Sequence, residues 1–135
     1  MTGTVTIRYR SFRADIYLTA LETLPLRNLK KLFKLAGQER HTNEEAIEAI
    51  RRHLDETIPE AQATMRAAAL DYENGWRKVD RPRSRHPTVV EQLRKNKELT
   101  AAFKKAHARY ERLVSVRKVF NEILAPDTKH PMKSN

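Results

Sequence analysis

The stretch that decides the fold runs from Val89 to Leu124 and reads VVEQLRKNKELTAAFKKAHARYERLVSVRKVFNEIL. These 36 residues include neither glycine nor proline, the two residues that interrupt helices most strongly. In a heptad register that begins at Val89, eight of the eleven a and d positions are apolar. The pattern predicts one long helix whose apolar seam pairs with another helix, as in a hairpin or a coiled coil.

The two ends of this predicted helix differ in character. Up to Val114 the cations lie on the side opposite the seam, at about 100° per residue. After Ser115 apolar residues occupy most of the circumference, which indicates burial on most sides. The sequence does not decide what buries this end. It can pack on an earlier helical module of the same chain, or on the same end of a second copy in a homodimer.

A second apolar seam runs from Ile47 to Val79 in steps of three and four residues. Pro59 lies within it, and we expect the helix to break or kink sharply there. Residues 59–78 should then pair with 89–124 as an antiparallel hairpin. The predicted fold class is all-α.

Helix boundary signals place a small helical module at residues 14–58, before the 59–124 hairpin. Gly37 is predicted to end a helix in the left-handed conformation. Thr42–Glu45 and Thr88–Glu91 have the pattern of capping boxes and should begin the two following helices.

The termini are predicted to lie outside this helical framework. Residues 4–10, within an N-terminal arm, 1–13, alternate between apolar and polar, which is the pattern of a half-buried strand. The chain offers no equally clear second strand, so this one should pair with a partner or a second copy, pack as an extended arm, or stay disordered. Residues 125–135 follow a helix stop at Ala125-Pro126 and should form a disordered tail. The whole chain, 1–135, is expected to be a single helical domain.

Charge is partitioned along the chain. The net charge is +10, and residues 81–135 alone carry +9, whereas residues 41–80 carry −4. A strongly basic segment favours anionic partners, either nucleic acid or an acidic protein surface. There is no apolar run long enough for a membrane span and no signal-peptide pattern, so we expect no membrane association and a cytoplasmic location.

Residue patterns of known catalytic chemistry are missing from the sequence. The chain has no cysteine, its five histidines are scattered, and no glycine-rich phosphate loop occurs. Glu44, Glu45 and Glu48 form an acidic cluster, but the dipole of a helix N-terminus accounts for it. We expect no catalytic residues, no metal site and no cofactor, and therefore a protein that is not an enzyme.

A basic loop at residues 80–87 supplies the clearest candidate site. Arg81, Arg83 and Arg85 alternate with Pro82 and Ser84, an extended arrangement suited to contact with phosphates. The predicted contacts to nucleic acid or another polyanion are Arg81, Arg83, Arg85, Arg94, Lys97, Lys105, Arg109 and Arg112.

About a fifth of the chain, Leu26–Leu54, resembles a SAP-type DNA-binding helix–loop–helix. The resembling positions are Leu29, Lys30, Leu32, Gly37, Ile47 and Ile50. The resemblance implies DNA binding through the loop, but the second glycine and the lysine usual in that loop are missing. Glu44 and Glu45 lie near the place of the lysine and would face phosphate unfavourably.

Two functions follow as hypotheses. The first is a non-enzymatic basic helical protein that binds nucleic acid through backbone charge. The second is a protein-interaction module, such as a phage or mobile-element accessory or inhibitor protein that docks on an acidic or nucleic-acid-processing protein. Its protein or dimer contacts would be Tyr72, Trp76, Val116, Val119, Phe120 and Ile123. Exposure of these residues in the monomer would favour the second hypothesis.

Overall fold

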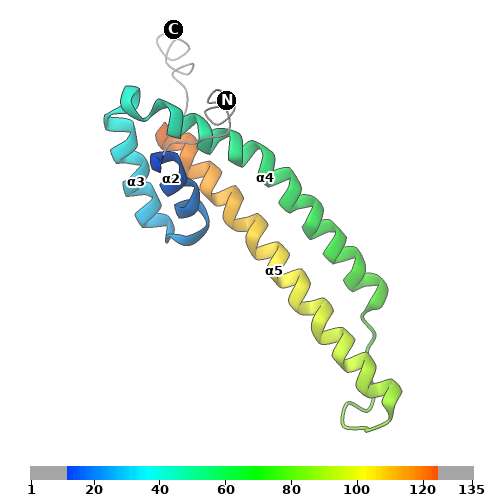
Figure 1. Ribbon diagram of the computed structural model, residues 1–135. Helices are drawn as coiled ribbons and strands as arrows, with labels where there is room; N and C mark the ends of the chain where they lie inside the picture. Colours follow the sequence, from blue (N-terminus) through cyan, green and yellow to red (C-terminus); the bar gives the residue numbers. More distant parts are fainter. Residues whose placement is uncertain (1–11, 125–135) are drawn as a thin grey trace, which may run out of the picture. The chain divides into compact units, whose positions relative to one another are not determined.

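The computed structural model describes residues 12–124, which form four helices (Figure 1). The helices are α2 (Phe12–Thr23), α3 (Leu26–Gln38), α4 (Arg40–Gly75) and α5 (Pro87–Leu124). The predicted all-α class is confirmed, and these described residues contain no strand. The strand expected at 4–10 and the tail expected at 125–135 lie outside the described residues.

The chain divides into two compact units. The first, which we call the four-helix unit, comprises the described residues 12–56 and 113–124. The second, the hairpin unit, comprises residues 57–112. Helices α4 and α5 contribute to both units, so the hairpin unit is an insertion between two parts of the four-helix unit.

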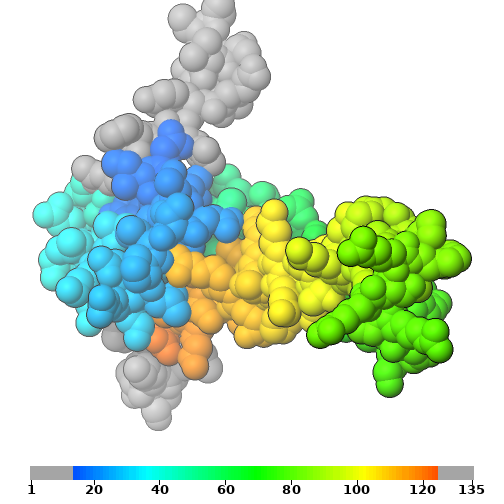
Figure 2. Space-filling model, turned by 90° about the horizontal axis from the view of Figure 1, so that it is seen from below, coloured from blue at the N-terminus to red at the C-terminus, as the bar shows by residue number. Residues whose placement is uncertain are grey.

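The core of the four-helix unit takes side chains from all four helices. The largest fully buried ones are Leu21, Leu29, Phe33, Ile50, Leu54, Leu113, Val116, Phe120 and Leu124. The ring of Phe33 meets that of Phe120 edge to face, with centroids 5.8 Å apart and planes at 82°. Figure 2 shows α3 lying over the C-terminal end of α5. The apolar end of α5 is therefore anchored inside its own chain.

Two polar side chains close helix ends in the four-helix unit. The Asn43 amide donates to the backbone oxygens of Ala36, at 3.1 Å, and Glu39, at 3.0 Å. The guanidinium of Arg40 donates to the backbone oxygen of Leu124 at 2.9 Å. The last carbonyls of α3 and α5, which no helical N–H can reach, thus gain partners from the first turn of α4.

Three boundary predictions are wrong. Gly37 does not end α3, because the helix runs on to Gln38 and no described glycine has a positive φ. A Cβ at Gly37 would lie 3.2 Å from Cδ2 of Leu124, so this position allows the end of α5 to approach closely. Thr42 does not cap α4, which begins at Arg40 with Glu39 accepting the first bonds from Thr42 and Asn43.

Helix α5 also starts differently from its predicted capping box. It begins at Pro87, where the missing N–H costs nothing. His86 takes the capping role: its Nδ1 accepts from the Thr88 N–H at 3.2 Å, and its carbonyl accepts from the Val90 N–H at 3.0 Å. Thr88 is therefore not the cap, and Glu91 is engaged elsewhere.

The hairpin unit pairs the second part of α4 with the first part of α5. The rings of Tyr72 and Phe103 lie 6.2 Å apart across this pair. Of the break or sharp kink expected at Pro59, the break is wrong, since α4 is continuous through this residue. A proline removes one ladder bond, but the neighbouring Thr57, Ile58 and Ala61 are buried, and their packing keeps the helix intact.

No helix between residues 12 and 124 combines the length and the apolar composition that crossing a membrane requires.

Candidate nucleic-acid interface

All eight cations predicted to contact a polyanion lie in the hairpin unit. Arg81, Arg83 and Arg85 belong to the connection 76–86 between α4 and α5, and the other five lie on α5. Seven of the eight are exposed, and Arg112 is half-buried. The structure therefore brings all eight to one compact part of the protein.

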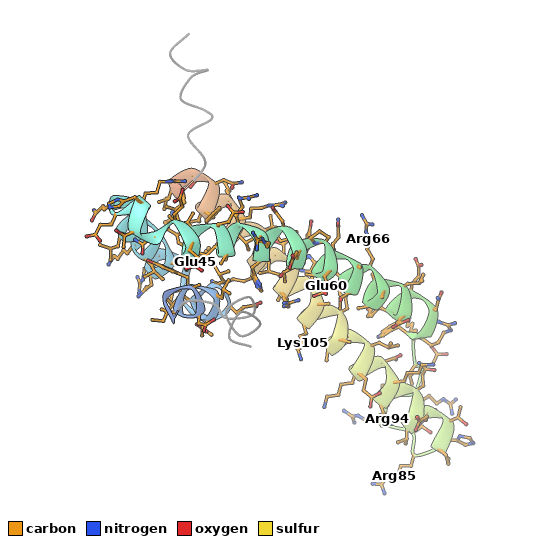
Figure 3. All side chains as sticks on the ribbon, turned by 45° about the horizontal axis from the view of Figure 1, so that its top comes forward. Glu45, Glu60, Arg66, Arg85, Arg94 and Lys105 are labelled. Atoms are coloured by element: carbon orange, nitrogen blue, oxygen red, sulfur yellow. The ribbon has the colours of Figure 1, made fainter. Side chains whose placement is uncertain are left out.

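On α5 these cations share a broad face. At 100° per residue, Arg94, Lys105 and Arg112 fall within about 20° of one another, with Lys97 and Arg109 about 60° to either side. A rise of 1.5 Å per residue spreads them over about 27 Å. Figure 3 shows Arg85, Arg94 and Lys105 pointing away from α4, whereas Arg66 points outward from α4.

The positive charge of the hairpin unit is one-sided. The α5 part, residues 87–112, carries seven Lys and Arg against three Glu, and the connection 76–86 carries five against one Asp. The α4 part, residues 57–75, has only Arg66 against three acidic residues. An anion approaching the hairpin unit is consequently attracted to α5 and the connection and repelled by α4.

Two carboxylates on α5 already hold Arg94. Its guanidinium forms ion pairs with Glu91, one turn before, and with Glu98, one turn after, the latter at 2.6 Å. The hydrogen bond from Arg94 and its charge lower the pKa of Glu91, and the same pairing raises the pKa of Arg94. A phosphate must displace these carboxylates before it can use Arg94.

A buried amide network fixes the start of the connection. Asn96 on α5 is only 8% exposed. Its Oδ1 accepts from the backbone N–H of Arg77 at 3.0 Å, and its Nδ2 donates to the backbone oxygen of Arg77 at 2.7 Å. Gln92 donates to Asn96 Oδ1 at 2.7 Å and to the backbone oxygen of Gly75 at 3.0 Å.

The close packing at Gly75 supports this network. A Cβ there would lie 2.9 Å from Cδ1 of Leu99, nearer than a real Cβ contact. The absence of a side chain lets the end of α4 reach α5, where Gln92 and Asn96 bind it. Asn96 occupies an a position of the heptad register and is one of its three polar exceptions, but this position alone does not identify it as the residue that anchors the connection.

The residues predicted to contact a protein partner are found in two different settings. Val116, Val119 and Phe120 are buried in the four-helix unit, and Ile123 is half-buried there. In the hairpin unit, Tyr72 is half-buried and stacks on Trp76 at 6.0 Å, with Trp76 37% exposed. The six therefore do not form one surface.

The segment that resembles a SAP motif has a different connection. Helices α3 and α4 are separated by Glu39 alone, so a single residue takes the place of the loop. Glu44 and Glu45 are both exposed on α4.

Within residues 12–124, no group of three or more histidine, aspartate or glutamate side chains is placed to hold a metal ion.

Comparison of the chain with protein-family models, with curated proteins and with solved structures gives no match.

Proposed function

We propose that this chain binds nucleic acid through the phosphate backbone, using the cations of the hairpin unit. The observation that carries the proposal is the one-sided charge of that unit: α5 and the connection together hold twelve Lys and Arg against four acidic residues, whereas the α4 part holds Arg66 against three. The cations follow a helix axis, so they can meet successive phosphates along a strand.

The binding chemistry would be electrostatic and independent of base sequence. Each Lys or Arg that neutralises a phosphate releases condensed counterions, and this release drives association. The clamp of Asn96 on Arg77 holds the start of the connection in place before binding. Less conformational entropy is then lost when Arg81, Arg83 and Arg85 engage phosphates.

The burial of the end of α5 supports this function over a protein-docking one. Val116, Val119 and Phe120 are at most 5% exposed within their own unit, so a partner would have to open the core to reach them. Trp76 is the exposed residue that favours the second candidate, docking on an acidic protein surface as an accessory or inhibitor protein, or homodimerisation. Light scattering tests the homodimer directly.

The proposal describes a non-enzymatic binding protein that works in the cytoplasm. Fluorescence anisotropy with single- and double-stranded DNA and RNA, between 50 and 200 mM salt, tests it. If six or more cations contact phosphates, affinity should fall on the order of a thousandfold over this range. Absence of binding to all four probes at 50 mM would overturn the proposal.

Charge-removing variants locate the surface. Lys97→Gln/Lys105→Gln removes two exposed cations from α5, and the slope of log affinity against log salt should become shallower by about 2. The matched control is Lys30→Gln/Lys31→Gln, two exposed lysines of α3 in the four-helix unit, which should leave the slope unchanged. Equal effects of the two variants would show that net charge, and not this surface, drives binding.

A further inference from the structure

A cleft of about 420 Å³ opens between the connection and the start of α5. It lies wholly within the hairpin unit. The lining includes two cations, two hydroxyls and two valines: Lys78, Arg81, Ser84, Thr88, Val79 and Val89. Its volume is within the roughly 300–1,000 Å³ typical of small-ligand sites.

The two cations of the cleft are not engaged by carboxylates. Among residues 12–124, neither Lys78 nor Arg81 forms an ion pair, and Asp80, the one carboxylate in the lining, is not paired with them. This differs from Arg94, which two glutamates hold. An anion in the cleft would therefore meet a net charge of +1 without displacing a partner.

Two N–H groups in the first turn of α5 already have partners, whereas side-chain hydroxyls of the cleft remain able to donate. The N–H groups of Thr88 and Val90 are already bonded to His86. Ser84 Oγ accepts the N–H of His86 at 3.2 Å, which leaves the hydroxyl hydrogen of Ser84 available to donate. Gln92 forms a firm wall, because it is bonded to Gly75 and Asn96.

We propose that this cleft binds one nucleotide unit. Lys78 and Arg81 pair with its phosphate, the hydroxyls of Ser84 and Thr88 donate to the phosphate oxygens, and the half-buried Val79 and Val89 contact the nucleoside. The nucleotide is either free or part of a strand. The inference rests on the proposed function, since Arg81 is one of the eight cations predicted to contact a polyanion and also lines the cleft.

Amide NMR of the full chain tests the inference with three probes. These are adenosine 5′-monophosphate, adenosine as the control without phosphate, and a short single-stranded oligonucleotide. We expect the monophosphate or the oligonucleotide to shift the amides of residues 78–92, and adenosine at equal concentration not to shift them. Lys78→Gln/Thr88→Val, which changes two exposed side chains, should weaken that ligand about tenfold.

The results distinguish a free nucleotide from a nucleotide within a strand, and they test the cleft separately from the proposed function. Shifts with the monophosphate indicate a free nucleotide, and shifts with the oligonucleotide alone indicate a nucleotide within a strand. If neither ligand shifts these amides, or if Lys78→Gln/Thr88→Val binds like the unchanged protein, the cleft inference is wrong. A different variant tests the proposed function, which is binding of nucleic acid by the cations of the hairpin unit. That proposal is wrong if Lys97→Gln/Lys105→Gln leaves the oligonucleotide affinity and its salt dependence unchanged.

Discussion

Replacing Asn96 by alanine tests whether one buried amide holds the connection between α4 and α5. The Asn96 side chain satisfies both the N–H and the carbonyl of Arg77, at 3.0 and 2.7 Å, and accepts from Gln92. Asn96→Ala removes all three bonds and leaves the part-buried Arg77 backbone without a protein partner.

These three bonds set the loss of folding stability expected for Asn96→Ala. Each intramolecular hydrogen bond contributes about 0.5–1.5 kcal/mol net, and a polar group left unsatisfied in a buried site costs about 1–3 kcal/mol. Because the Arg77 side of the network is only part-buried, water can satisfy some of it. We therefore expect the free energy of unfolding to fall by about 2–3 kcal/mol, a large part of the roughly 5–15 kcal/mol of a typical domain.

Urea denaturation followed by circular dichroism measures this loss. Asn74→Ala is the matched control, because Asn74 is exposed near the end of α4 and should change stability by less than about 0.5 kcal/mol. A loss of less than about 0.5 kcal/mol in Asn96→Ala as well would refute the anchoring role. Hydrogen exchange at the Arg77 amide should also accelerate in Asn96→Ala and not in Asn74→Ala.

Asn96→Asp gives the same prediction a pH dependence. An introduced carboxylate keeps an acceptor for the Arg77 N–H but faces the Arg77 carbonyl with a second oxygen instead of a donor. Burial and that carbonyl raise the pKa of the introduced carboxyl above its ordinary value. Stability relative to the unchanged protein should be highest below the ordinary pKa and should decline as pH rises to the raised pKa. Equal destabilisation at pH 4 and 7 would contradict this reasoning.

Three further predictions follow from the contacts of α5. Phe120→Ala, which removes a side chain 1% exposed and edge-on to Phe33, should cost about 3–5 kcal/mol in urea denaturation, and a loss below about 1 kcal/mol would contradict the anchor. Glu91→Gln/Glu98→Gln should release Arg94 and raise oligonucleotide affinity by about twofold to fivefold in anisotropy titrations, comparable to one surface ion pair; unchanged affinity would argue against phosphate contact by Arg94. Arg94→Gln should return the pKa of Glu91 towards its ordinary value in carboxyl NMR titrations. The stability that this pair contributes is present at neutral pH and is lost as pH falls through the lowered pKa, and a pKa of Glu91 that does not rise in Arg94→Gln would contradict the pairing.

Long-range periodicity was the most informative part of the sequence. The seam of α5 and the change of pattern after Ser115 were sufficient to predict an all-α fold with a helix end buried on most sides. The pattern left open whether the cover came from the same chain or from a second copy. That choice depends on which face of α3 meets Phe120, and no local signal encodes the contact.

Local boundary signals were less reliable, because tertiary contacts compete with them. Gly37 has the residue type of a helix end, but its lack of a side chain serves the approach of Leu124. Thr88 and Glu91 are spaced as a capping box, but His86 already accepts the first N–H groups and Glu91 pairs with Arg94. A motif shows which bonds are available locally, and the folded structure determines which of them form.

The candidate site shows the same division between what patterns predict and what packing adds. Helical spacing was enough to place the cations of α5 on a face opposite the seam. Glu91 lies three residues before Arg94 and Glu98 lies four residues after it, so helical spacing also indicates the two ion pairs. The role of Asn96 could not be predicted, because it depends on where the end of α4 meets α5 in space.

The insertion of the hairpin unit into the four-helix unit determines the order in which the protein can fold during synthesis. Arg40 binds the carbonyl of Leu124, 84 positions later, and Phe33 packs on Phe120 near the same end. On the ribosome, α2, α3 and the start of α4 emerge long before the residues that complete their core. Residues 57–112 form a contiguous hairpin, whose contacts are complete earlier. Helices α2 and α3 therefore finish folding after the hairpin unit, although they are made before it, because the part of their core that α5 supplies is made last.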